Sequence, residues 1–116
     1  MCSNKAPPSD CNIGHYGRIK KLMMTKEQTT KALIICNAYG SKAQMIKCCE
    51  ELSELETAIL HHLNKGEKQD SILEEMADVY IMLEQLRFML PYDEAALEEK
   101  IEYKLNRQLS RIMSAD

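Results

Sequence analysis

Carboxylates recur at a fixed spacing in two parts of the chain. The sequence EELSE occupies residues 50–54, and EEMAD occupies residues 74–78. In a helix, residues three apart share a face, about 60° apart around the axis and roughly 4.5 Å along it. Like charges at this spacing repel one another, so a cation is expected between them. The two candidate ligand pairs are Glu51 with Glu54 and Glu75 with Asp78.

The ligand type indicates which cation this would be. Carboxylates and water suit magnesium or manganese far better than copper or zinc. The predicted cofactor is therefore Mg²⁺, with Mn²⁺ as a possible substitute. A di-iron carboxylate bundle also uses helical acidic pairs, but it needs Glu-x-x-His segments. His61 and His62 have no glutamate three positions before them, so this class of site is not expected.

Helices are expected to position both acidic groups. Thr25 with Gln28 is typical of a capping box and predicts a first helix that ends near residues 39–40. Ser41 is a candidate cap for the second helix. That helix is expected to run to about residue 64, before the break at residues 65–66.

Two further helices follow. Ser71 with Glu74 forms another candidate capping box, and Pro91 marks the end of the third helix. Asp93 is the expected N-cap of the fourth helix, which extends to about Ile112. No segment alternates as a half-buried strand does. The expected fold is an all-α, small four-helix antiparallel bundle of one domain over residues 25–116, preceded by a tail or arm over residues 1–24.

Apolar residues at spacings of three and four predict a buried stripe on each helix. At 100° per residue, Glu51 lies about 90° from the centre of the second helix's stripe, and Glu54 about 150°. Glu75 and Asp78 lie roughly 60° and 120° from the stripe of the third. The predicted stripes are Met45, Cys48, Leu52, Leu55, Ile59, Leu63; Ile72, Met76, Val79, Leu83, Leu86, Leu90; and Leu97, Ile101, Leu105, Leu109, Ile112.

Composition narrows the class of protein. The formal net charge of −3 argues against a nucleic-acid partner, and no apolar run reaches the ~20 residues that a membrane span requires. The five cysteines are an odd number with no signal peptide before them, which indicates a reduced, cytoplasmic protein. Cys2, Cys11 and His15 lack a fourth ligand and a compact spacing, so zinc is not expected there. A domain of 116 residues buries a limited core, which favours self-association.

The acidic segments resemble those of the MazG-like pyrophosphohydrolases of the all-α NTP pyrophosphatase superfamily. The similarity covers about residues 36 to 112. It rests on EExxE at residues 50–54, ExxD at residues 75–78 and the apolar VYIML run that follows, with weaker likeness at residues 39–40 and 104–107. The short single domain and the segment before Thr25 depart from the larger, tandem members of the family.

The resemblance implies hydrolysis of a nucleoside triphosphate to the monophosphate and pyrophosphate, with Mg²⁺ held by the four acidic positions. It also implies a helical bundle that forms dimers or tetramers. Phosphoribosyl-ATP or dUTP is an alternative substrate within the same superfamily. The non-enzymatic alternative is a helical interaction module whose carboxylates are merely solvated. The implied ligands are Glu51, Glu54, Glu75 and Asp78.

Several further residues are candidates for catalysis or phosphate binding. Glu50 points about 100° away from Glu51 and could orient a ligand or accept a proton, as the catalytic residue, or be an ordinary surface residue. Lys47 lies one turn before Glu51 and could bind substrate. Lys104 and Arg107 could also hold phosphate oxygens, or simply complement the dipole of the fourth helix.

Overall fold

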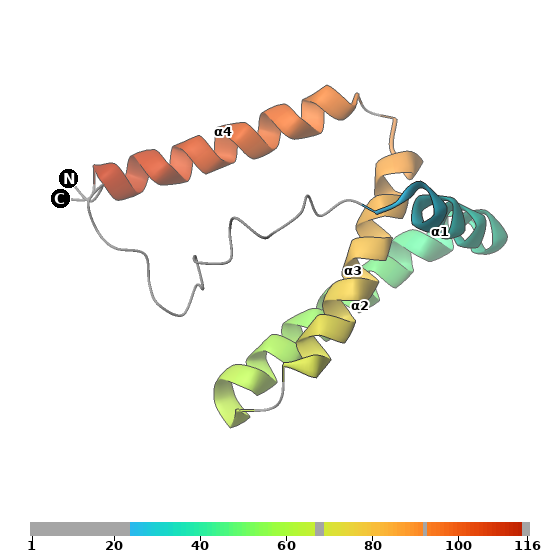
Figure 1. The fold of residues 1–116 in the computed structure, drawn as a ribbon, viewed down its shortest axis with the longest axis horizontal. Coiled ribbons are helices and arrows are strands. Elements are labelled where there is room, and N and C mark those ends of the chain that lie inside the picture. The colour runs from blue at the N-terminus through green and yellow to red at the C-terminus, as the bar shows by residue number, and fades with distance from the viewer. Residues whose placement is uncertain (1–23, 67–68, 92, 115–116) are drawn as a thin grey trace. The chain divides into compact units, whose positions relative to one another are not determined.

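The computed structural model describes residues 24–66, 69–91 and 93–114, and within them the chain is all helical, with four helices and no strand (Figure 1). The all-α prediction is therefore confirmed for this part of the chain. The predicted N-terminal arm, with Cys2, Cys11 and His15, lies almost entirely outside the described residues. The helices are α1 (Lys26–Tyr39), α2 (Ser41–Lys65), α3 (Asp70–Met89) and α4 (Glu94–Met113).

The start of α1 follows the predicted capping box. The Thr25 hydroxyl accepts a hydrogen bond from the Gln28 backbone N–H at 3.1 Å, and the Gln28 side chain accepts one from the Thr25 N–H at 2.9 Å. At its other end, Gly40 adopts φ 95°, a conformation that favours glycine, and its N–H donates to the Cys36 carbonyl. Gly40 also occupies the N-cap of α2, so the prediction of Ser41 as the cap is wrong by one residue.

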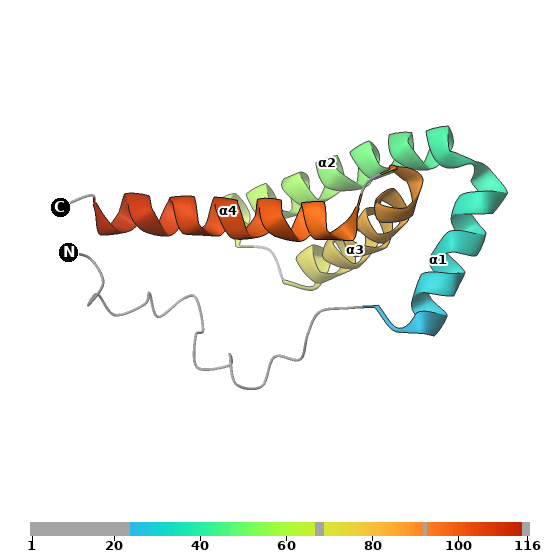
Figure 2. The same ribbon diagram turned by 90° about the horizontal axis from the view of Figure 1, so that it is seen from above.

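Helices α2 and α3 form an antiparallel hairpin, side by side in both views (Figures 1 and 2). Gly66, in the left-handed conformation at φ 69°, ends α2. The predicted Ser71 and Glu74 capping box is wrong. The N-cap is Gln69, whose backbone is already helical and whose side chain makes no capping bond, so α3 starts before Ser71 can act as a cap.

The hairpin has a regular register. Gln44 of α2 donates to the side-chain carbonyl of Gln85 of α3 at 2.8 Å. One heptad further along α2 and one heptad back along α3, Glu51 and Asp78 contribute to a single cluster. This repetition is the pattern expected of helices that pack nearly parallel to their common axis.

Helix α1 lies across the end of the hairpin where α2 begins and α3 ends (Figure 2). Two polar contacts fix it there. Gln85, which has no exposed surface, donates to the Ala32 carbonyl at 2.9 Å, and Thr29 donates to Glu84 at 2.6 Å. The buried apolar side chains of the described residues come from all three helices: Ala32, Cys36, Cys48, Val79 and Met82.

The predicted buried stripe of α2 is rotated by about 60° from the observed buried face and shares only Cys48 with it. The face toward α3 carries Gln44, Cys48 and Glu51, all buried. The sequence pattern found the apolar residues but could not tell which of them have a neighbour. Four members of the predicted stripe are instead 36–72% exposed: Met45, Leu52, Ile59 and Leu63.

The same displacement affects α3, where Leu83 and Leu90 are exposed. Together the two helices carry apolar residues at every seventh position along one flank of the hairpin, beside the α2–α3 contact. We call this surface the heptad seam. Its members are Met45, Leu52 and Ile59 of α2 with Met76, Leu83 and Leu90 of α3.

Helix α4 is described by itself. Asp93 caps it as predicted, accepting a hydrogen bond from the Ala95 N–H at 3.3 Å. Glu94 in its first turn and Arg111 in its last complement the helix dipole. The helix has no buried residue, so burial of its predicted stripe is not observed; Leu97, Ile101, Leu105, Leu109 and Ile112 are all exposed.

Among the described helices, none is both long enough and apolar enough to cross a membrane.

Candidate metal centre

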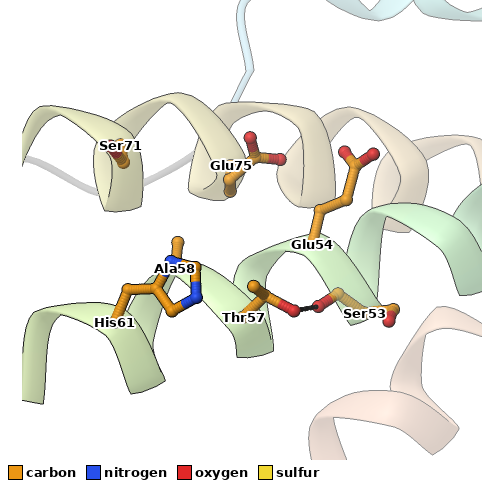
Figure 3. A pocket seen from close by; sticks show the side chains of 7 residues that line it. All are labelled: Ser53, Glu54, Thr57, Ala58, His61, Ser71 and Glu75. Carbon is orange, nitrogen blue, oxygen red and sulfur yellow. Dashed lines mark hydrogen bonds between the residues drawn. The ribbon is translucent and has the colours of Figure 1, made fainter. Parts of the chain in front are cut away.

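Four carboxylates converge where the middle of α2 meets α3. Each contributes one oxygen, and these four oxygens all lie within 4.8 Å of one another. The structure thus brings together the complete set of predicted ligands. The Glu54 side chain extends from α2 toward α3, where its carboxylate lies beside that of Glu75 (Figure 3). The members of this carboxylate cluster are Glu51, Glu54, Glu75 and Asp78.

The convergence follows from the true orientation of α2. Because the face toward α3 is centred near Glu51, Glu54 lies only about 60° further round the helix. The gap of 150° expected from the apolar stripe therefore does not arise. The antiparallel register then places Asp78 opposite Glu51 and Glu75 opposite Glu54.

The size of the cluster suits one hard divalent cation. Oxygens bound to the same magnesium lie at about 2.1 Å from it, and therefore at most about 4.2 Å from one another. The observed limit of 4.8 Å is within a side-chain adjustment of that value. A cluster made only of carboxylate oxygens matches magnesium or manganese in ligand chemistry.

Two atoms of the cluster lack a hydrogen-bond partner although they are buried. They are Oε2 of Glu51 and Oε2 of Glu75. Glu51 as a whole is only 5% exposed. A buried charged oxygen without a partner is costly, and such atoms are usually satisfied by a donor or a cation. The residues present therefore fit a bound metal ion.

Lys47 forms an ion pair with a member of the cluster. Its Nζ lies 3.1 Å from Oε1 of Glu51 and 3.6 Å from Oε2 of Glu50. One lysine against four clustered carboxylates leaves a local excess of negative charge. Glu50 itself is exposed and points out of the cluster toward Lys47.

The carboxylates differ in their proton affinity. Burial raises the pKa of Glu75, and the charge of Glu54 raises it further. Burial also raises the pKa of Asp78, followed by its hydrogen bond and charge interaction with Glu51. For Glu51, burial acts to raise the pKa, but hydrogen bonds led by that of Lys47 outweigh it and leave the pKa lowered. Glu51 is thus held in its ionised form more firmly than Glu75 or Asp78.

The pKa of Lys47 is shifted in the direction opposite to that of Glu51. Its hydrogen bond to Glu51, and then the charge of Glu51, raise the pKa of Lys47. The two predicted phosphate ligands Lys104 and Arg107 lie on α4 and are not members of the carboxylate cluster. Arg107 lies over the ring of Tyr103, 5.7 Å from its centroid.

The apolar pattern gave no sign of the buried glutamines or of a polar groove beside the cluster. The groove contains Thr57, His61 and Ser71 next to Glu54 and Glu75 (Figure 3). Gln44 and Gln85 could have been recognised from their position one heptad from Glu51 and Asp78.

Comparisons with family models, with curated proteins and with solved structures give no match to this chain.

Proposed function

We propose that this protein is a magnesium-dependent nucleoside triphosphate pyrophosphohydrolase of the MazG-like kind, yielding a monophosphate and pyrophosphate. The observation that carries the metal part of this proposal is the buried Glu51 carboxylate, whose Oε2 has no partner and belongs to four converging carboxylates. The substrate class comes from the resemblance of the acidic segments. Manganese is the alternative cofactor because it has the same ligand preferences.

The proposed roles follow from position and charge. Glu51, Glu54, Glu75 and Asp78 would hold the metal. When bound, magnesium neutralises phosphate charge and lowers the pKa of a coordinated water. Glu50 is exposed and pairs with Lys47 outside the cluster, and in this proposal it would accept a proton from an attacking water at the outer edge of the site. Lys47, whose ammonium group pairs with Glu51 and Glu50, would also attract a phosphate oxygen.

A nucleotide panel tests the reaction. The purified protein would be incubated with Mg²⁺ and canonical, deoxy and modified nucleoside triphosphates, including dUTP, and with phosphoribosyl-ATP, and the products would be resolved by chromatography. We expect monophosphate and pyrophosphate from a triphosphate. Turnover of phosphoribosyl-ATP or dUTP alone would select one of the alternative substrates. Release of single phosphate, or no turnover at all, would contradict the proposal.

Glu75→Gln is the decisive variant because it keeps the shape of a ligand and removes its charge. We expect kcat/KM to fall by at least about 100-fold, as for groups that hold a catalytic metal. Glu74→Gln is the matched control, since Glu74 precedes it on the same helix and lies outside the cluster. Equal activity of the two variants would show that the cluster does not serve turnover.

We also propose that the protein self-associates through the heptad seam. Apolar side chains at every seventh position of two antiparallel helices are the pattern by which helices pack into a four-helix bundle. A second copy offers the same pattern, as a two-fold interface requires. On α2, Leu52 lies about 160° from Glu54 and about 100° from Glu51, so pairing through the seam would not have to cover the carboxylates.

The mass in solution tests this second proposal. Light scattering after size exclusion should give a multiple of the 13.3 kDa chain mass. Leu52→Lys should reduce it to that of one chain, because a lysine at the seam cannot be buried unpaired. Ile34→Lys, at an exposed apolar position on α1, should leave the mass unchanged. A wild-type protein with the mass of one chain would rule out the pairing.

A further inference from the structure

A polar groove continues from the carboxylate cluster along the hairpin toward the α2–α3 turn. Glu54 and Glu75 form one end, and Thr57, His61 and Ser71 lie beyond them (Figure 3). Its volume is about 290 Å³. Binding pockets for small-molecule ligands are usually about 300–1,000 Å³, so this groove is at the lower end of the range and suits one part of a nucleotide better than the whole.

The chemistry of the groove suits a neutral, hydroxyl-bearing group. Among its described lining residues there is no lysine, arginine, tyrosine, tryptophan or phenylalanine. The described lining therefore supplies no lysine or arginine to hold a phosphate and no large aromatic side chain to stack on a base. The hydroxyl of Thr57 donates to the Ser53 carbonyl at 3.0 Å, which leaves its lone pairs to accept a hydrogen bond. His61 and Ser71 add an imidazole and a second hydroxyl.

The surroundings of the cluster are asymmetric in charge. On α2, Lys47 lies one turn before Glu51, whereas Thr57 and His61 lie one and two turns after Glu54. A nucleoside triphosphate is asymmetric in the same sense, with an anionic phosphate end and a neutral sugar. Charge complementarity places the outer phosphates toward Lys47 and the sugar toward the groove.

We propose that this groove is a sugar subsite in which Thr57, His61 and Ser71 recognise ribose hydroxyls of the nucleotide. The inference rests on the proposed pyrophosphohydrolase function and specifies its substrate class as ribonucleotides. The distance along α2 is suitable, because the seven residues from Glu54 to His61 span about 10 Å. A phosphate held at the cluster thus has room for its sugar before the groove ends.

The test is the ratio of kcat/KM for matched ribo and deoxy substrates, ATP with dATP and GTP with dGTP. One net hydrogen bond to the 2′-hydroxyl gives an expected preference for the ribonucleotide of roughly 3- to 10-fold. Thr57→Val, His61→Ala and Ser71→Ala should each lower the ratio, mainly by slowing the ribonucleotide. A variant that only damages the fold would slow both sugars equally.

Lys47→Gln is the matched control because it changes the opposite, phosphate end. It should lower kcat/KM for both sugars by the same factor and leave their ratio unchanged. Thr57, His61 and Ser71 are all exposed, so each substitution should leave the fold intact, and the three variants test the subsite independently. A wild-type ratio of one or below, or a ratio that none of the three variants changes, would overturn the sugar subsite. No turnover of any nucleotide would instead overturn the proposed function.

Discussion

Two layers of polar side chains occupy the same α2–α3 interface one heptad apart, and they are satisfied in opposite ways. In the glutamine layer, Gln44 and Gln85 are neutral, buried and bonded to each other, and Gln85 also reaches the Ala32 carbonyl. In the carboxylate layer, buried oxygens of Glu51 and Glu75 have no partner. Equivalent helix geometry therefore has two outcomes: the glutamine layer completes its own hydrogen bonds, whereas the carboxylate layer leaves buried oxygens that could hold a cation.

The largest expected effect comes from placing a charge in the glutamine layer. Gln85→Glu should lower the free energy of unfolding by about 3 kcal/mol or more, because a fully buried carboxylate would face the Gln44 amide without a counter-charge. Urea unfolding followed by circular dichroism measures this.

Gln85→Met is the matched control for that change. It removes the hydrogen bonds but adds no charge, so we expect a smaller loss, of about 1–3 kcal/mol. If Gln85→Glu were no more destabilising than Gln85→Met, the glutamine layer would tolerate charge and the contrast between the layers would fail.

The next largest effect is expected in the pH dependence of stability, to which only the carboxylate layer should contribute. The pKa values of Glu75 and Asp78 are raised in the folded protein, so the folded state binds their protons more tightly than the unfolded state. Their destabilising effect at neutral pH should therefore diminish as the pH falls toward about 5. The lowered pKa of Glu51 acts in the opposite sense, but only below its ordinary value of 4.5.

The measurement is the melting temperature of the metal-free protein between neutral pH and about pH 5. The melting temperature of wild type should include a rise on acidification that comes from Glu75 and Asp78. The doubly substituted Glu75→Gln, Asp78→Asn protein should lack this rise. With saturating Mg²⁺ the trend should reverse, because protons compete with the metal for the same oxygens. An identical pH profile for wild type and the double variant would contradict the electrostatic account of the cluster.

The smallest effect is expected from removing one charge from the metal-free cluster. Glu75→Gln relieves repulsion from Glu54 and should raise the melting temperature by about 1–2 °C in the presence of a chelator. Differential scanning calorimetry would detect this. Glu74→Gln, outside the cluster, should change the melting temperature by less. A clear drop in the melting temperature of Glu75→Gln would instead show that its carboxylate stabilises the metal-free fold.

Capping residues in the sequence predicted the start of a helix correctly only where the backbone of the capping residue is not itself helical. Thr25 and Asp93 cap their helices as predicted because both have extended backbones and short oxygen-bearing side chains. Ser41 and Ser71 carry suitable side chains, but the chain is already helical at both positions. Cap chemistry alone could not reveal that.

The ligand set was predictable from spacing, but the orientation of α2 was not. Apolar periodicity selected Met45, Leu52 and Ile59, which are exposed in the described chain, in place of Gln44 and Glu51. A hydrophobic pattern cannot identify a buried face that carries polar residues. The separate heptad seam is the physical reason that the apolar pattern pointed in the wrong direction.

The central claim is that the carboxylate cluster binds a divalent cation, and a magnesium titration of thermal stability tests it most directly. At a concentration about a hundredfold above the dissociation constant, linkage predicts a rise in melting temperature of roughly 10 °C for wild type. Glu75→Gln should show little or none of this rise, and Glu74→Gln should retain it. A wild-type melting curve unchanged by millimolar Mg²⁺ or Mn²⁺, or equal shifts in wild type and Glu75→Gln, would contradict the claim.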